Sequence, residues 1–217
     1  MATSRAQQIG IWIIAIVLTV GTIGLSIVSV LSTNNTKNDA ARKTELTNQY
    51  QAEYAEYQKK VDAQATELSG KYFTDFSQYS SRAAAFDAAG VTELKTEDLV
   101  VGDGADITAS STFTAYYIGW RPDALVFDQS IDGDKLKAPF TAAPGGVISG
   151  WSEGVVGMKV GGVRELTIPS AKAYGETGSG DKIPANTPLK FVIMIIPTPP
   201  TIAAPQPSAE LLKLYSQ

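Results

Sequence analysis

Residues 147–175 read VISGWSEGVVGMKVGGVRELTIPSAKAYG and carry the strongest structural signals of the chain. Residues 149–158 have the length of one short helix, and Ser149 is a candidate for its N-terminal cap. Residues 163–168 form a β-type run, and glycines separate the two segments. This order predicts a short helix followed directly by a strand, within one α+β domain.

Strand signals recur on both sides of this stretch. Further strands are predicted at residues 112–119, 125–128 and 189–196. In the last of these, every second residue is apolar: Leu189, Phe191, Ile193 and Ile195. The residues between them form a second set, whose first member is Lys190. This is the pattern of a sheet covered on one face. We therefore expect one globular domain over residues 95–197.

The chain before this domain begins with a short tail, residues 1–8, and an apolar run. Residues 9–31 carry no charge, and about 20 apolar residues suffice to cross a bilayer. The sequence predicts a single-pass transmembrane anchor. The alternative is a cleaved signal peptide, but the apolar core of such a peptide is usually only about 7–15 residues long.

The orientation of this anchor has two opposing indications. Arg5 lies on one side, and Lys37, Arg42 and Lys43 on the other favour a cytoplasmic C-terminal part. A single N-terminal anchor followed by a soluble module is nevertheless the usual plan of an exported protein. We expect the domain to be extracytoplasmic.

Residues 37–69 have a helix-forming composition without proline or glycine. Their apolar positions follow an eleven-residue period, which is typical of a nearly straight helix, roughly 50 Å long at 1.5 Å per residue. Two interpretations are open: a stalk that sets reach or pairs with a copy of itself, or a surface helix packed on its own domain.

Two segments flank these elements. Gly70 is the expected stop of the helix, and residues 70–94 are predicted to be a connector with one short helix on the domain edge. Residues 198–217 are a proline-rich tail that we expect to be disordered, with residues 211–215 as an amphipathic segment that can dock.

The composition excludes several functional classes. Lysine and arginine total 18 against 22 acidic residues, so the chain lacks the basic surface that nucleic-acid binding requires. Histidine and cysteine are absent, which removes histidine-dependent nucleophilic catalysis and the usual zinc ligands. Any chemistry must use carboxylates, hydroxyls, amides or shape.

Three segments together closely resemble the FKBP-type peptidyl-prolyl isomerases. They are FDQSIDGDKLKAPF (127–140), the stretch 147–175 and IPANTPLKF (183–191), and the resemblance covers about half of the chain. It implies an antiparallel, half-wrapped β-sheet around one short helix. It also implies an enzyme that needs no cofactor or metal, acts on proline-containing polypeptides and is open to macrolide inhibitors.

The resemblance also implies a pocket. Its catalytic residues are Asp128, Tyr174, Ile148 and Phe127, and its substrate-binding residues are Tyr117, Phe140, Val147, Trp151, Ile183 and Phe191. Trp151 is expected to be the floor under the proline ring, with aromatic walls around it. A single aromatic residue more often belongs to the hydrophobic core than to a binding site. The joint occurrence of these residues at the spacing of the family nevertheless favours their assignment to a pocket.

The polar members of the set have separate implied roles. The backbone N–H of Ile148 and the hydroxyl of Tyr174 are expected to hold substrate carbonyls, and Asp128 is expected to face the carbonyl of the isomerising bond.

Two departures from the family pattern bear on substrate preference and rate. Many members carry an arginine between the positions of Asp128 and Phe140, where this chain has only Lys135 and Lys137 as cations. Lys182 occupies a position that is often apolar in the family.

Three functions follow as hypotheses. The first is a prolyl isomerase that assists folding at the membrane. The second is a non-catalytic chaperone or adaptor that binds proline peptides in the same cleft. The third is an envelope spacer whose domain is vestigial.

Overall fold

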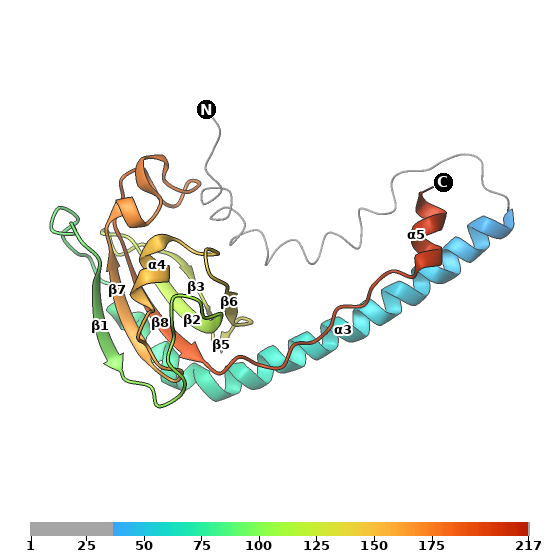
Figure 1. Ribbon diagram of the computed structural model, residues 1–217, viewed down its shortest axis with the longest axis horizontal. Helices are drawn as coiled ribbons and strands as arrows, with labels where there is room; N and C mark the ends of the chain where they lie inside the picture. Colours follow the sequence, from blue (N-terminus) through green and yellow to red (C-terminus); the bar gives the residue numbers. More distant parts are fainter. Residues whose placement is uncertain (1–36, 217) are drawn as a thin grey trace. The chain divides into compact units, whose positions relative to one another are not determined.

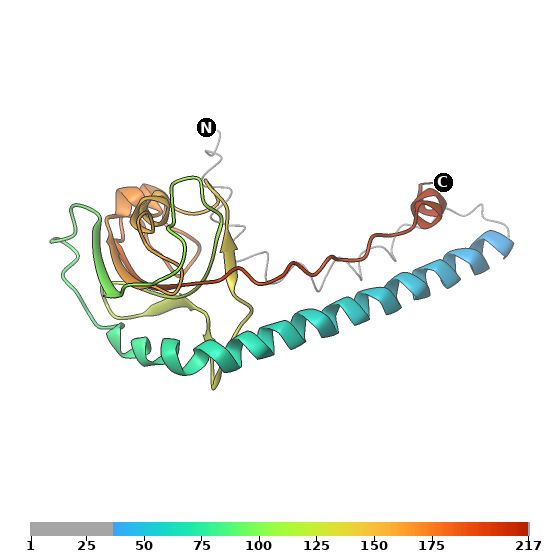
Figure 2. The same cartoon turned by 60° about the horizontal axis from the view of Figure 1, so that its bottom comes forward.

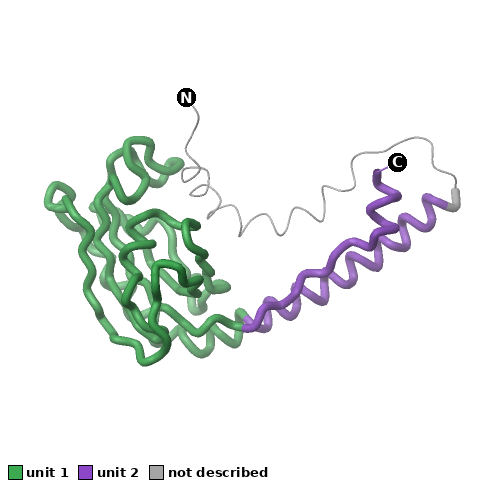
Figure 3. Tube along the Cα trace, viewed as in Figure 1, with its two compact units in different colours: residues 1–14, 65–199 green, residues 15–64, 200–217 purple. Residues whose placement is uncertain are grey.

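The computed structural model describes residues 37–216, whose helices and strands are shown in Figure 1. They form two compact units: residues 65–199 are the described part of unit 1, and residues 37–64 with 200–216 are that of unit 2 (Figure 3). The predicted membrane anchor, residues 9–31, lies outside the described residues. Between residues 37 and 216, no helix has both the length and the apolar character needed to span a bilayer.

Unit 1 is built on an antiparallel sheet with strand order β1-β7-β8-β2-β3, in which β6 and β3 pair with successive parts of β2. The strands are β1 (Lys95–Val100), β2 (Phe113–Trp120), β3 (Val126–Gln129), β6 (Phe140–Ala142), β7 (Val163–Ile168) and β8 (Leu189–Ile196), and a separate hairpin pairs β4 (Ile131–Asp132) with β5 (Lys135–Leu136). The predicted strands are confirmed, the first two shifted by one residue. β1, whose residues are largely exposed, was not among them.

Helix α4 (Ser149–Gly154) packs on one face of this sheet (Figures 1 and 2). It is shorter than predicted, and the expected serine cap is wrong. Ile148 is the N-cap residue, while the hydroxyl of Ser149 donates to the carbonyl of Lys172 at 3.3 Å. Short 3-10 helices follow β7: η3 (Ser170–Lys172) and η4 (Gly175–Thr177).

The opposite face of the sheet is also covered, so the predicted one-sided sheet is wrong. On this face Tyr116, Ile118 and Trp120 of β2 pack with the last turns of α3 (Lys37–Ser77). Phe76 of α3 is fully buried, and its ring centroid lies 6.1 Å from that of Tyr116. Because successive strand residues point to opposite faces, the strands carry apolar residues on this second face as well wherever α3 covers it.

Helix α3 passes through Gly70, so the expected stop there is wrong. A glycine costs only about 1 kcal/mol inside a helix, and tertiary contacts hold the helix on both sides of it. The Ser69 hydroxyl accepts a hydrogen bond from the N–H of Leu136 at 2.8 Å, and Phe76 is buried about two turns after Ser69.

The connector leaves α3 through the 3-10 helix η2 (Gln78–Arg82) and packs against the second face of the sheet. The indole N–H of Trp120 donates to the carbonyl of Ala84 at 3.1 Å. Arg82 donates to Glu165 at 2.5 Å, and Lys190 binds the same carboxylate at 2.8 Å. Residues outside the predicted 95–197 domain therefore complete its second core.

Unit 2 pairs the first part of α3 with the C-terminal tail, and the expectation of a disordered tail is wrong. Figures 1 and 2 show the tail running beside α3 as an extended chain. The amide of Gln64 donates to the carbonyl of Pro200 at 2.9 Å, and Arg42 holds Glu210 with two bonds of 2.9 Å. The lengths match, since the helix rises about 33 Å between its two contact points and the extended tail covers about 31 Å.

The tail ends in helix α5 (Ala209–Tyr215), which extends the predicted amphipathic segment by two residues. Its Leu211 is buried, as is Leu46 of α3. The ammonium of Lys43 lies 3.7 Å from the centroid of the Tyr215 ring. Part of the predicted stalk is therefore covered by the protein's own tail.

The second core contains one unsatisfied polar group, the hydroxyl of Tyr116. The residue is fully buried, and no described residue forms a hydrogen bond with that oxygen. Burial, followed by the nearby Tyr72, raises the pKa of Tyr116 to about 12. An unmade hydrogen bond in a buried site costs about 1–3 kcal/mol, so this hydroxyl destabilises the packing of α3 on the sheet.

We predict that Tyr116→Phe raises the free energy of unfolding at neutral pH by about 1 kcal/mol or more, because it removes this group. The folded-state pKa lies above the unfolded value of about 10. Wild-type stability should therefore fall between pH 10 and 12, and the variant should lose less over that range. Urea unfolding at several pH values measures both effects. Tyr50→Phe, on the half-buried face of α3, is the control, and an equal response of the two variants would contradict this account.

Candidate functional site

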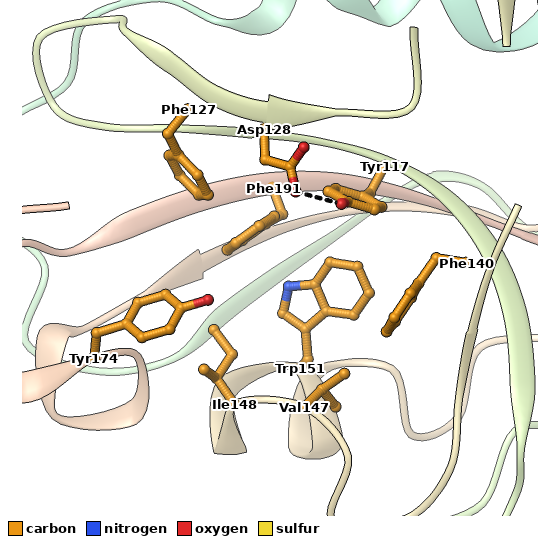
Figure 4. A pocket seen from close by; sticks show the side chains of 9 residues that line it. All are labelled: Tyr117, Phe127, Asp128, Phe140, Val147, Ile148, Trp151, Tyr174 and Phe191. Carbon is orange, nitrogen blue, oxygen red and sulfur yellow. Dashed lines mark hydrogen bonds between the residues drawn. The ribbon is translucent and has the colours of Figure 1, made fainter. Parts of the chain in front are cut away.

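One pocket opens on the α4 face of the sheet, and its side chains are drawn in Figure 4. It is lined by Tyr117, Phe127, Asp128, Phe140, Val147, Ile148, Trp151, Tyr174 and Phe191. They come from β2, β3, β6, β8, the start of α4 and the residue before η4. The site is therefore assembled from parts of the chain that are far apart in sequence.

Trp151 forms the base of the pocket, with only 4% of the residue exposed. The ring centroids of Phe191, Tyr117 and Phe140 lie 5.2, 5.4 and 6.0 Å from that of Trp151, each nearly perpendicular to it. Edge-to-face contacts of this kind are favourable arrangements of aromatic rings. They hold the indole in one orientation below an apolar opening.

Two glycines allow α4 to bring Trp151 to this position. A Cβ added at Gly150 would lie 2.3 Å from the side chain of Ile168, and one at Gly154 would lie 2.8 Å from that of Leu166. Both partners belong to β7, so the helix backbone sits directly against the strand. Any larger residue would lift α4, and Trp151 with it, from the sheet.

A third glycine shapes the wall. Gly119 of β2 lies under two rings, and a Cβ there would come within 2.5 Å of Phe191 and 2.7 Å of Phe127. These two rings pack edge to face with centroids 5.5 Å apart. The absence of a side chain at residue 119 therefore makes room for this wall.

The polar part of the pocket is centred on Asp128. The hydroxyl of Tyr117 donates to Asp128 Oδ2 at 2.5 Å (Figure 4). The N–H of Gln129 donates to Oδ1 at 2.9 Å. Burial raises the pKa of Tyr117 well above its ordinary value, and the charge of Asp128 raises it further. Tyr117 thus keeps its proton at neutral pH and holds the carboxylate in place.

Two further donors belong to pocket residues. Burial, and then the charge of Asp128, raises the pKa of Tyr174, so its hydroxyl stays protonated, and it points into the pocket (Figure 4). Among the described residues, no group accepts a hydrogen bond from this hydroxyl or from the N–H of Ile148. Both can therefore donate to a ligand.

No cation takes the place of the missing arginine within residues 37–216. The ammonium of Lys137 donates to the carbonyl of Gln129 at 2.9 Å, and that of Lys135 lies 3.9 Å from Asp132. Neither pairs with Asp128. This part of the chain also holds no group of three or more carboxylates that could bind a metal ion.

Nine of the ten side chains predicted for the site line this pocket, and Ile183 does not. Ile183 is 3% exposed and belongs to the hydrophobic core beside it. It lies in the loop before β8 and packs in the same core cluster as Phe127 and Phe191, behind the wall of the pocket.

Sequence reasoning missed two residues that support the base. Phe113 stacks on Trp151 with centroids 6.4 Å apart, and its spacing of four residues from Tyr117 on β2 could have indicated the shared face. Arg164, mostly buried, donates to the carbonyls of Gly154 and Val156 at 2.8 and 3.0 Å and binds Asp98. The available signal was a charged residue that alternates on β7 with the apolar Leu166 and Ile168, which places it on their face of the sheet.

Comparison with known proteins gives consistent matches. Residues 104–196 match the family model of the FKBP-type peptidyl-prolyl cis-trans isomerases. The FK506-binding protein of Neisseria meningitidis serogroup A is 40% identical over 100 residues, which cover 46% of this chain and 91% of that protein. A probable FK506-binding protein of Corynebacterium glutamicum is 40% identical over 106 residues, covering 48% and 86%.

Among solved structures, a peptidyl-prolyl cis-trans isomerase from Pseudomonas syringae aligns with a TM-score of 0.44 and 30% identity, covering 55% of this chain and 90% of that one.

Proposed function

This chain belongs to the FKBP-type peptidyl-prolyl cis-trans isomerases, and from that premise we propose that the pocket above Trp151 binds the proline of a polypeptide and accelerates rotation about the preceding bond. The observation that carries the proposal is the convergence of nine predicted side chains, from six parts of the fold, on one apolar pocket.

The physical requirement is a site that prefers a twisted amide. Rotation about a peptide bond costs about 18–20 kcal/mol because twisting destroys resonance, and the X-Pro bond exchanges in tens to hundreds of seconds. Catalysis requires that the twisted form bind better than either planar form. The twisted imide has less charge separation than the planar one, so an apolar, water-poor site favours it.

In this proposal the proline ring lies over the indole of Trp151, between the walls formed by Tyr117, Phe127 and Phe191. The hydroxyl of Tyr174 and the N–H of Ile148 donate to substrate carbonyls. Fixed donors of this kind orient the substrate and cost no reorganisation during the reaction.

Asp128 is proposed to face the carbonyl of the bond that rotates. Its two hydrogen bonds, from Tyr117 and from the N–H of Gln129, fix its position without a cation. The names of the relatives further suggest that FK506-type macrolides occupy the same pocket and compete with peptide.

Protease-coupled isomerisation of an X-Pro peptide tests this assignment. Asp128→Ala and Phe127→Ala should each lower kcat/KM about 10-fold or more, a loss of about 1.4 kcal/mol of transition-state stabilisation. FK506 should inhibit the wild type. Asp132→Ala, which removes an exposed carboxylate from the adjacent hairpin, should leave the rate unchanged.

A thermal melt of each variant must show that the fold is retained. Peptide binding without acceleration by the wild type would indicate the chaperone or adaptor alternative. Unchanged rates in both pocket variants would remove the site assignment.

We also propose that residues 9–31 hold the enzyme in a membrane, with its clients among newly exported chains. The support is the uncharged apolar length of this segment. The full chain should remain in membranes after an alkaline carbonate wash, and a chain of residues 37–217 should be released. Protease added to intact cells should reach the domain. A mature protein whose mass lacks the first 31 residues would contradict the anchor.

A further inference from the structure

A loop of unit 1 crosses beside the pocket wall between Tyr174 and β8. Ser179 and Ile183 close its tip with two backbone hydrogen bonds of 2.8 and 3.1 Å, so residues 180–182 form a small exposed turn. The tip is thus a short, well-defined structure. Tyr174 at the start of the loop lines the pocket, and Ile183 on its return is buried in the core.

Lys182 at this tip is bound at two points to the hairpin formed by β2 and β3. Its ammonium donates to the carbonyl of Phe127 at 3.1 Å. Its own carbonyl accepts a hydrogen bond from Nη1 of Arg121 at 2.7 Å. Arg121 directly follows β2, and Phe127 lies in β3, so the two bonds reach both arms of one hairpin.

Arg121 is itself held in position by Asp123. Nε and Nη2 of the guanidinium bond to the two carboxylate oxygens at 3.2 and 2.5 Å, and Asp123 Oδ1 also accepts from the N–H of Leu125 at 3.3 Å. The side chain of Arg121 is only 18% exposed although that of Asp123 is 57% exposed. A planar guanidinium can serve a carboxylate and a carbonyl together.

We infer that Arg121 and Lys182 form a clasp that orders the loop against the wall of the pocket, and that both are positioning residues for prolyl isomerisation. The clasp bridges the two sides that carry Phe127 and Tyr174, so it fixes the distance between them. An apolar residue at position 182 could not make the bond to Phe127. The departure from the family pattern at this position therefore has a structural purpose in this chain.

The inference rests on the proposed function, and kinetic and exchange measurements on the full chain test it. Lys182→Met keeps the aliphatic stem but loses the ammonium, and Arg121→Gln loses the bond to residue 182. If the loop must be ordered for binding, each should raise KM about 3- to 10-fold, the range of one lost hydrogen bond. kcat should stay within about twofold.

Hydrogen exchange gives a second readout that a general loss of stability would not reproduce. The amides of Ser179 and Ile183 should exchange about 3- to 10-fold faster in both variants, while amides of β8 keep their protection. Because both residues act on one loop, the increases in KM and in exchange rate of the double variant should be smaller than the products of the increases in the two single variants.

Two controls separate the clasp from general surface charge. Lys182→Arg retains a cationic donor and should stay within about twofold of wild type. Lys159→Met removes a surface ammonium 3.4 Å from Asp106, outside the pocket lining, and should change neither KM nor loop exchange. The inference is overturned if the clasp variants leave KM or loop exchange unchanged, or if only kcat falls. If the wild type fails to accelerate isomerisation, the proposed function fails, while the exchange rates still test the clasp.

Discussion

The strict alternation of side chains along β2 and β8 determines both the pocket and the packing of α3. Tyr117 and Phe191 point to the pocket, while their neighbours Tyr116 and Val192 point to the second core. The same strands therefore shape the pocket on one face and hold the end of α3 on the other. Any shift of one residue in the pairing of these strands would exchange the two sets and remove both cores. This explains why an element outside the family match, the end of α3, belongs to the folding unit that contains the pocket.

The second constraint is that backbone segments and rings approach each other closely at positions where the residue has no side chain. Gly150 and Gly154 seat α4 on β7, and Gly119 leaves space for two rings. Hydrogen bonds then fix the parts of the site that the aromatic rings do not hold. Tyr117 positions Asp128, and the clasp orders the loop. The pocket is thus walled by apolar rings, and its polar end is held in place by hydrogen bonds.

Much of this could be predicted from the sequence because short-range patterns decide it. The period-two runs predicted the central strands, and the resemblance to the FKBP family implied nine of the lining residues. The sequence could not show that Ile183 lies in the core beside the pocket, because its position in a motif does not tell which side of the pocket wall it occupies. The predicted helix end at Gly70 was wrong because the helix propensity of one glycine changes the free energy by only about 1 kcal/mol. Burial of the Phe76 side chain contributes more stabilisation than that. The position of the tail depends on contacts between residues far apart in sequence, such as Arg42 with Glu210. The role of Arg164 likewise depends on its bond to the carbonyl of a helix residue. No local sequence pattern reveals such contacts.

In the proposed function a proline ring sits on the indole of Trp151. NMR spectra of the protein saturated with an isotope-labelled X-Pro peptide test this placement through cross-relaxation between the proline ring protons and the Trp151 indole protons. We expect strong contacts of this kind in the exchanging complex, together with contacts to Phe191. If the cis/trans exchange of the peptide is accelerated while its proline contacts only residues outside the pocket, the proline does not bind at Trp151 and the proposed site is wrong.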